Sequence, residues 1–223
     1  MKKILPLLTA VISLALIVIW QFFAQSTNFY IIAFGILILS MLPLFISFER
    51  SRPSARQLAL ISSLIAIAVI SRVVFYLVPQ IKPIGAVVIV SGVCLGAKKG
   101  YIVGAFSAFI SNFMFGQGPW TLFQMVALGL VGLISGLIFN KKAKKIPLAI
   151  VGFLLVFVVY GLVVDLNTVL FFTGDYSIQS VLAIYAAGVP FNLIFAVSTA
   201  VFLLLFGESF IKKINRITTK YDL

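Results

Sequence analysis

The chain has 223 residues, of which 62% are hydrophobic and only 10% are charged. A soluble domain is about half apolar and about a quarter charged, so this composition excludes an ordinary soluble fold. The chain has no histidine and one cysteine, which excludes a disulfide framework, a histidine-ligated metal site and a Cys–His nucleophile. Several apolar runs reach the roughly 20 residues that a helix needs to cross a bilayer, which predicts an all-α integral membrane protein.

Two apolar runs, at residues 4–23 and 29–48, open the chain. The first run has lysines before it and has features of a signal peptide, with residues 24–26 (Ala-Gln-Ser) as a loose cleavage site. The run is long for that role, however, and another apolar run follows directly. These features favour a retained two-helix transmembrane hairpin over residues 1–50.

A charged segment that contains a proline, residues 49–56, separates this hairpin from the rest. Ser54 is a predicted helix cap, because a serine side chain accepts hydrogen bonds from the first free amides of a helix. The remainder, residues 51–223, contains six apolar runs, at about 57–78, 84–97, 100–115, 120–139, 146–172 and 179–210. We therefore predict a six-helix substrate-binding membrane core and eight transmembrane helices in all. The last two runs exceed the bilayer thickness, so we expect tilt, kinks or a non-helical extension.

The basic residues predict the orientation of these helices. With an even number of spans, both termini lie on one side of the membrane. If that side is cytoplasmic, the inner loops hold 15 of the 17 basic residues: Lys2, Lys3, Arg50, Arg52, Arg56, Lys98, Lys99, Lys141, Lys142, Lys144, Lys145, Lys212, Lys213, Arg216 and Lys220. Cytoplasmic loops are rich in lysine and arginine, which predicts a multi-pass protein of the cell membrane with both termini cytoplasmic. The net charge of +12 could suggest that the protein binds nucleic acid, but the placement of the basic residues in these loops argues against it.

Polar residues interrupt the apolar pattern in the outward-facing connection Ser111–Gln124. It contains the amides Asn112, Gln117 and Gln124, together with two glycines, a proline and Trp120. A tight interfacial turn with capped helix ends explains these residues without any ligand. We favour the rim of a small-molecule pocket, because unpaired polar groups are costly in hydrocarbon and tryptophan stacks on flat ligands.

Asp165 lies inside an apolar run, and an acid in a membrane span is a functional hypothesis by default. The alternative is an ion pair with Arg72, one of only two basic residues predicted to face outward. We predict that one outward cavity collects the following substrate-binding residues: Arg72, Asn112, Gln117, Trp120, Gln124, Asp165 and Asn192. The sequence has no P-loop, His-Glu-x-x-His or Gly-x-Ser-x-Gly segment, so we predict neither catalytic residues nor a cofactor.

Small residues recur four positions apart in two places. Glycines do so in the middle of the chain, at Gly92, Gly96, Gly100 and Gly104, and again at Gly132 and Gly136, which predicts close helix packing. Alanine and serine do so near the start of the core, at Ala55, Ala59, Ser62, Ser63 and Ala66. This second strip is either an intramolecular contact or a docking strip for another membrane subunit.

Several motifs occur together within residues 55–215. They are Arg72 before a proline-flanked loop, Ser91–Gly96 leading to Lys98-Lys99-Gly100, Ser111-Asn112-Phe113, Gly116-Gln117-Gly118-Pro119-Trp120-Thr121 with Gln124-Met125, Tyr160-Gly161 with Asp165-Leu166, and Asn192. Together they resemble the substrate-binding S components of energy-coupling factor (ECF) vitamin transporters, which have a six-helix core. The motifs look most like the S components associated with cobalamin.

The resemblance implies a chain that binds a micronutrient at its outer face and is not itself an enzyme. A transmembrane coupling subunit and two ATPase subunits of an ECF module would supply movement and energy. The implied substrate is vitamin B12 (cobalamin) or a related corrinoid, held by amides, aromatic rings and shape because the chain has no histidine. The alanine docking strip of the family maps onto Ala59/Ser63 or Ser62/Ala66, with Ala55/Ala59 as another register. The alternative is a polytopic membrane scaffold or an intramembrane enzyme, although Asp165 alone is a thin catalytic set.

Overall fold

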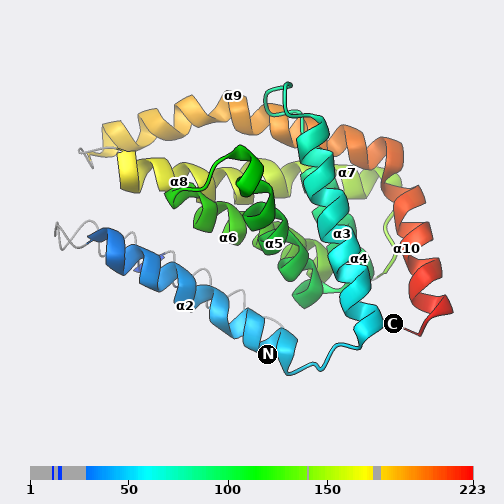
Figure 1. Cartoon of the computed structure of the whole chain (residues 1–223). Helices are drawn as coiled ribbons and strands as arrows, with labels where there is room; N and C mark the ends of the chain where they lie inside the picture. Colours follow the sequence, from blue (N-terminus) through cyan, green and yellow to red (C-terminus); the bar gives the residue numbers. More distant parts are fainter. Residues whose placement is uncertain (1–11, 13–14, 17–28, 140, 173–176, 223) are drawn as a thin grey trace.

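The computed structural model describes residues 12, 15–16, 29–139, 141–172 and 177–222, and within them every regular element is a helix (Figure 1). The elements are α2 (Phe29–Glu49), α3 (Ala55–Val74), α4 (Ile84–Leu95), α5 (Ala97–Phe115), α6 (Pro119–Ile138), α7 (Lys145–Leu154), the π-helical segment η1 (Leu155–Tyr160), α8 (Gly161–Phe172), α9 (Ile178–Phe202), the π-helical segment η2 (Leu203–Gly207) and α10 (Glu208–Lys220). The all-α prediction is confirmed.

Four of the described helices are long and apolar enough to cross a membrane: Ala55–Val74, Pro119–Ile138, and the continuous helices Lys145–Phe171 and Ile178–Lys220. The chain is therefore a multi-pass membrane protein. The predicted total of eight spans stays a prediction, since most of the run at residues 4–23 lies outside the described residues.

Helix α4 has only 12 residues and, unlike α7 and α8, is not continued by another helical segment. At 1.5 Å per residue it rises about 18 Å, well short of the roughly 30 Å hydrocarbon core of a bilayer. Eleven of its residues, from Ile84 to Cys94, are buried. Helix α4 is therefore an internal helix that the surrounding helices shield from lipid.

The glycine spacing places backbones against each other where α4, α5 and α6 meet. A Cβ atom added at Gly92 would lie 2.1 Å from the carbonyl oxygen of Gly132, and one added at Gly104 would lie 2.2 Å from that of Leu128. These gaps admit glycine alone, which confirms the close packing predicted from the spacing. Gly96 has a different role: with φ +87° and no atom near an added Cβ, it forms the turn between α4 and α5.

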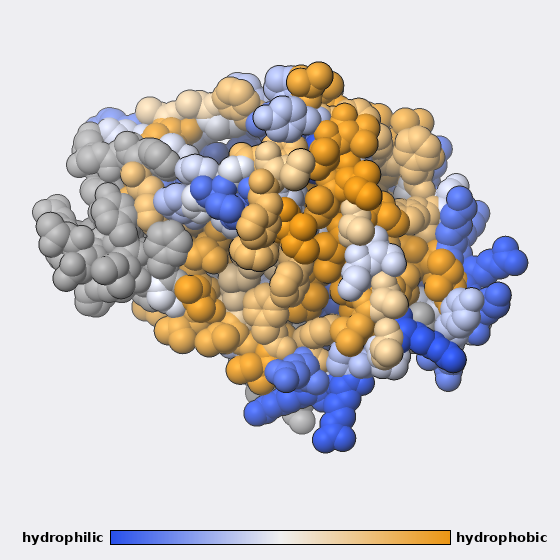
Figure 2. Space-filling view, viewed as in Figure 1, coloured by the Kyte–Doolittle hydropathy of each residue, from blue (hydrophilic) through white to orange (hydrophobic). Residues whose placement is uncertain are grey.

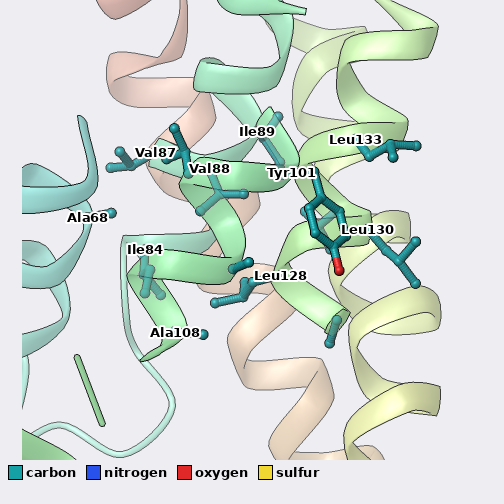
Figure 3. Close-up of a cluster of buried hydrophobic side chains, with 14 of the residues drawn as sticks. Ala68, Ile84, Val87, Val88, Ile89, Tyr101, Ala108, Leu128, Leu130 and Leu133 are labelled. Atoms are coloured by element: carbon teal, nitrogen blue, oxygen red, sulfur yellow. The ribbon is translucent and has the colours of Figure 1, made fainter. Parts of the chain in front are cut away.

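Large apolar side chains fill the space around these glycines (Figure 3). Tyr101 of α5 is fully buried, and its ring lies over Gly129 of α6. The side chains of Val88 and Leu133 are equally enclosed. This cluster makes α4, α5 and α6 the rigid centre of the bundle.

Helix α3 begins where the sequence predicted a cap. The hydroxyl of Ser54 accepts a hydrogen bond from the amide of Gln57 at 3.3 Å, which confirms the predicted cap. Helix α3 buries Ile61 and Leu64 against the bundle, and Figure 1 shows it on the outside of the molecule.

The two long apolar runs at the end of the chain continue through π-helical segments instead of breaking. Helices α7, η1 and α8 form one rod, and α9, η2 and α10 form another. Figure 1 shows α10 turning away from the line of α9 and running along one end of the bundle. Ile211 and Ile214 of α10 are buried, whereas Lys212, Lys213 and Arg216 are exposed, so α10 is an amphipathic extension beyond the apolar part.

The basic loops lie at one end of the bundle. The amide of Lys141 donates to the carbonyl oxygen of Val93 at the end of α4, and the Asn215 side chain of α10 donates to the carbonyl oxygen of Lys141. Ser51 of the α2–α3 connection and Lys98 of the first turn of α5 line a common surface groove. Figure 2 shows hydrophilic residues gathered below that connection and along α10, with apolar residues over α2 and α3. Which membrane side this basic end faces stays a prediction.

Candidate substrate-binding cavity

A cavity of about 400 Å³ lies at the N-terminal end of α4, where α3, α6, α8 and α9 surround the space that this short helix leaves. Its walls are formed by Arg72 of α3, Gln80 and Lys82 of the following loop, Ile84 of α4, Gln124 and Leu128 of α6, Tyr160 of η1, Val164, Asp165 and Thr168 of α8, and Ile184, Ala187, Gly188, Phe191, Asn192 and Phe195 of α9. Because α4 rises about 18 Å, the cavity floor lies about that far from the basic end.

The connection between α5 and α6 is held together by the hydroxyl of Thr121. This hydroxyl accepts hydrogen bonds from the Asn112 side chain at 3.1 Å and the Gly118 amide at 3.2 Å, and it donates to the Gln117 side chain at 2.9 Å. Gly116 has φ +96°, a conformation that glycine adopts without strain. Pro119 then starts α6 in its first turn, where the missing amide hydrogen costs nothing.

Asn112 links this connection to the cavity. Its side-chain amide also donates to Gln124 Oε1 at 2.9 Å, and its oxygen accepts from the Arg72 guanidinium at 2.8 Å. The same Arg72 nitrogen contacts the Ser111 hydroxyl. The network orients Arg72 and Gln124, which both line the cavity, while Asn112 is itself buried behind them.

Two cations of the cavity wall share one aromatic ring. The guanidinium carbon of Arg72 lies 4.2 Å from the ring centroid of Phe115, and Lys82 Nζ lies 4.7 Å from the same centroid. The Lys82 backbone amide also donates to the Ser198 hydroxyl of α9 at 3.1 Å. These contacts hold both positive charges at the cavity without an acidic partner among the described residues.

Helices α8 and α9 face each other through a polar pair. Asn192 Nδ2 donates to Asp165 Oδ2 at 2.7 Å. Each of these side chains lies against a glycine of the opposite helix: an added Cβ at Gly188 would be 2.3 Å from Asp165 Oδ2, and one at Gly161 would be 2.9 Å from Asn192 Nδ2. Asp165 pairs with the Asn192 amide and forms no ion pair with Arg72 in the described part of the chain.

Three aromatic side chains complete the wall: Tyr160, Phe191 and Phe195. The rings of Tyr160 and Phe195 meet edge to face, with centroids 4.9 Å apart. The residues of α9 that line the cavity are spaced as one helical face requires, with Ala187, Phe191 and Phe195 four apart. The cavity therefore combines apolar ring surface with a few convergent polar groups, which is the usual composition of a small-molecule site.

The seven predicted substrate-binding residues fall into three groups. Four of them line the cavity: Arg72, Gln124, Asp165 and Asn192. Asn112 lies behind the wall and positions two of these.

Gln117 lies in the α5–α6 connection and Trp120 in the first turn of α6, and neither lines the cavity. The Gln117 amide donates to the Phe109 carbonyl oxygen, and Trp120 Nε1 donates to the Gly116 carbonyl oxygen at 3.2 Å. The Trp120 ring covers Gly118, where an added Cβ would lie 2.4 Å from it. These contacts stabilise the connection.

Several cavity residues were not among the predicted site residues, and three had a readable signal. Thr168 follows Asp165 by three positions and so shares its helix face. Lys82 is the second basic residue predicted to face outward. Tyr160 was part of a motif behind the family resemblance, whereas Phe191 and Phe195 had no signal, because aromatic residues in membrane helices also face lipid or the core.

All five residues of the predicted docking strip, Ala55, Ala59, Ser62, Ser63 and Ala66, are exposed on one side of α3. The Ser63 hydroxyl donates to the Ala59 carbonyl oxygen at 2.8 Å, so this serine satisfies its own polar group within the helix. The strip therefore presents small side chains that no helix of the described residues buries. Its role in docking stays a prediction.

The fold and the cavity together define a class: a multi-pass helical membrane protein with an internal, small-molecule-sized site. A family model described as "ECF-type riboflavin transporter, S component" matches residues 52–212, which is more than half of the chain. The chain belongs to this family, and it is thus a membrane substrate-binding subunit of an ECF transporter for a vitamin. No curated protein and no solved structure matches the chain.

Membership has two further consequences. S components are transport subunits rather than enzymes, and the family associates with an ECF module made of a transmembrane coupling (T) component and ATPases. The matched region begins after α2 and ends within α10, so the family pattern covers the core helices from α3 to the start of α10.

Proposed function

We propose that this chain is the riboflavin-binding S component of an ECF-type importer and that the cavity at the end of α4 is its vitamin site. The family match over residues 52–212 supports the choice of riboflavin. The main observation in support of this site is the cavity itself. Its volume of about 400 Å³ falls within the roughly 300–1,000 Å³ of small-molecule pockets.

The chemistry of the wall suits a flavin. Riboflavin has a flat, largely apolar ring system, and Tyr160, Phe191 and Phe195 offer ring surface of that kind. The edge of the ring carries carbonyl oxygens, for which the guanidinium of Arg72 and the amide of Gln124 are donors.

The other end of a flavin is equally well matched. Its hydroxyl-bearing chain supplies donors, and the carboxylate of Asp165 is an acceptor with capacity beyond its bond to Asn192. The positive charges of Arg72 and Lys82 favour a ligand rich in oxygen acceptors.

Cobalamin, the substrate suggested by the sequence motifs, is the second candidate for the test. A corrinoid is several times larger than a flavin, so the cavity volume favours the smaller vitamin. The chain also offers no histidine to a corrinoid cobalt.

The binding test is titration calorimetry on the purified protein with riboflavin and with cobalamin. We expect riboflavin to bind and cobalamin to give no heat of binding. Asp165→Asn and Gln124→Ala should each weaken riboflavin binding by about 10- to 100-fold. Each change leaves a polar group of the bound vitamin buried without its hydrogen-bonding partner.

Lys213→Gln is the matched control, since Lys213 is exposed at the basic end and away from the cavity. Absence of riboflavin binding by monodisperse wild-type protein would refute the substrate. Riboflavin binding that both cavity variants leave unchanged would instead refute the site and keep the substrate.

The second part of the proposal is that the exposed strip of α3 docks the coupling component of the ECF module. Small side chains allow close helix approach, so bulk on the strip should prevent docking. We expect Ala59→Trp and Ala66→Trp to keep riboflavin affinity but abolish uptake and co-purification of the coupling and ATPase subunits. Leu42→Trp on the exposed face of α2 is the control. Normal uptake by both α3 variants would place docking elsewhere.

The third part is the orientation, with the basic end and both termini in the cytoplasm and the α5–α6 connection outside. Gln117→Cys and Ala143→Cys place thiols at opposite ends, and the native Cys94 is buried and adds little background. An impermeant thiol reagent should label intact cells through Gln117→Cys only. Labelling through Ala143→Cys alone would reverse the orientation.

A further inference from the structure

A second groove, of about 780 Å³, lies at the basic end, between α10 and the linker that joins α6 to α7. It is separate from the vitamin cavity, which lies at the other end of α4. The charged residues of its wall are Lys141, Lys142, Lys212, Arg216, Lys220 and Glu208. Glu208 pairs with Lys212 at 2.9 Å, which leaves four cations without an acidic partner among the described residues.

Lys141 of the linker is held in position, which gives the groove a defined shape. The Lys141 amide donates to the Val93 carbonyl oxygen at 3.1 Å, and Asn215 Nδ2 donates to the Lys141 carbonyl oxygen at 2.7 Å. Lys141 has φ +58°, a conformation uncommon for a residue with a side chain, and these two bonds hold it there. The linker and α10 therefore present their cations to one shared space.

The position of the groove matches the headgroup layer of a membrane. Helix α10 begins where the apolar helix α9–η2 ends, and its buried residues Ile211 and Ile214 keep it against the bundle. Helix α7 starts directly after the linker and exposes Ile146, Ile150 and Leu154, four residues apart on one face. A molecule with its anionic group in the groove would thus have an apolar path along α7 into the hydrocarbon.

We propose that this groove binds the headgroup of an anionic phospholipid, with an acyl chain along the Ile146–Leu154 face of α7. The phosphate is the group that pairs with the free cations, and Lys142 and Arg216 contribute from opposite walls. Basic pockets beside helix ends attract anionic lipid in this way, and each cation near the surface adds to the attraction. The apolar path selects a lipid over a free anion.

The test is native mass spectrometry of the full-length purified protein titrated with phosphatidylglycerol or phosphatidylcholine of equal chain length. We expect preferential binding of phosphatidylglycerol, and we expect Lys142→Gln with Arg216→Gln to weaken it by about 10- to 30-fold. The matched control is Arg56→Gln with Lys213→Gln, which removes the same charges from the same end but outside the groove. If the double variant does not fold, Lys142→Gln alone carries the comparison, since Lys142 is exposed.

Each other outcome overturns the proposal. Equal loss of phosphatidylglycerol in groove and control variants would mean a general charge effect. Competition by inorganic phosphate at equal concentration would make the groove a free-anion site. Unchanged lipid binding with lost co-purification of the ATPase subunits would make it a protein interface. Riboflavin affinity should not change in any of these variants, so failure here is distinct from failure of the vitamin site.

Discussion

Glycine has opposite consequences in two helix pairs of this bundle. Between α5 and α6 it brings backbone against backbone, with an added Cβ at Gly132 only 2.2 Å from the carbonyl oxygen of Gly100. Between α8 and α9, Gly188 and Gly161 instead make room for the side chains of Asp165 and Asn192. The α5–α6 contact leaves no space for other groups between the two helices, whereas the α8–α9 contact keeps polar groups beside a cavity. The atom opposite a glycine therefore decides whether that glycine contributes to stability or to binding.

The largest effect should come from Gly132→Ala. The atom that its methyl group would meet is a backbone oxygen, so neither helix can yield without separating. We expect a loss of about 3 kcal/mol or more in unfolding free energy, seen as a fall in the midpoint of thermal unfolding in detergent. Gly35→Ala in α2 is the control, because no atom lies within 4 Å of its added Cβ. Equal stability of the two variants would contradict the close α5–α6 contact.

Asn112→Ala should have the next largest effect. Asn112 lies where the close packing of α5 and α6 is followed by the polar network beside the cavity. The change leaves Arg72, Thr121 and Gln124 each without one hydrogen bond. We expect a loss of about 2 kcal/mol in stability together with weaker riboflavin binding, because Arg72 and Gln124 are no longer oriented. Unfolding midpoints measure the stability and calorimetry measures the riboflavin affinity of the same sample. A change in stability without a change in affinity would show that the network does not orient the binding site.

Gly188→Ala should act on binding more than on stability. Its methyl group would meet the end of a side chain, which can move, so the fold should tolerate it while Asp165 shifts. We expect about a tenfold loss of riboflavin affinity. The decisive control is the double-mutant cycle with Asp165→Ala, in which Gly188→Ala should cost nothing further. A full additional loss in that background would show that Gly188 acts without Asp165.

The smallest effect should come from Trp120→Phe. The change removes one exposed hydrogen bond, from the indole N–H to the Gly116 carbonyl oxygen, and shortens the ring whose outer edge covers Gly118. We expect a loss of at most about 1 kcal/mol in stability and no change in riboflavin affinity. A large loss of riboflavin affinity in calorimetry would instead show that Trp120 contacts the ligand, as the sequence suggested.

The sequence predicted the helices better than the site. Apolar length, the Ser54 cap and the glycine spacing each reflect local physics, and each has its counterpart in the structure. For the two over-long runs the sequence predicted tilt, kinks or a non-helical extension, and the extension of the second run is instead helical, the amphipathic helix α10.

The site depends on which residues from distant helices meet. Polar residues in apolar runs, such as Arg72 and Asp165, stand out in a sequence because they need partners in a membrane. Thr121 did not stand out, since a threonine at the start of a helix is ordinary, yet it joins three hydrogen bonds. Phe191 and Phe195 are apolar residues among many, so only the fold assigns them to the cavity.

The shortness of α4 also bears on how the protein is made. A 12-residue segment cannot hold a membrane-crossing position by itself while the chain is being synthesised. Its glycines and buried side chains find their partners on α5 and α6, which leave the ribosome later. We therefore expect α4 to enter the bilayer together with α5 and α6 as one inserted unit, so that a chain truncated before α6 would be recognised as incomplete by membrane quality control.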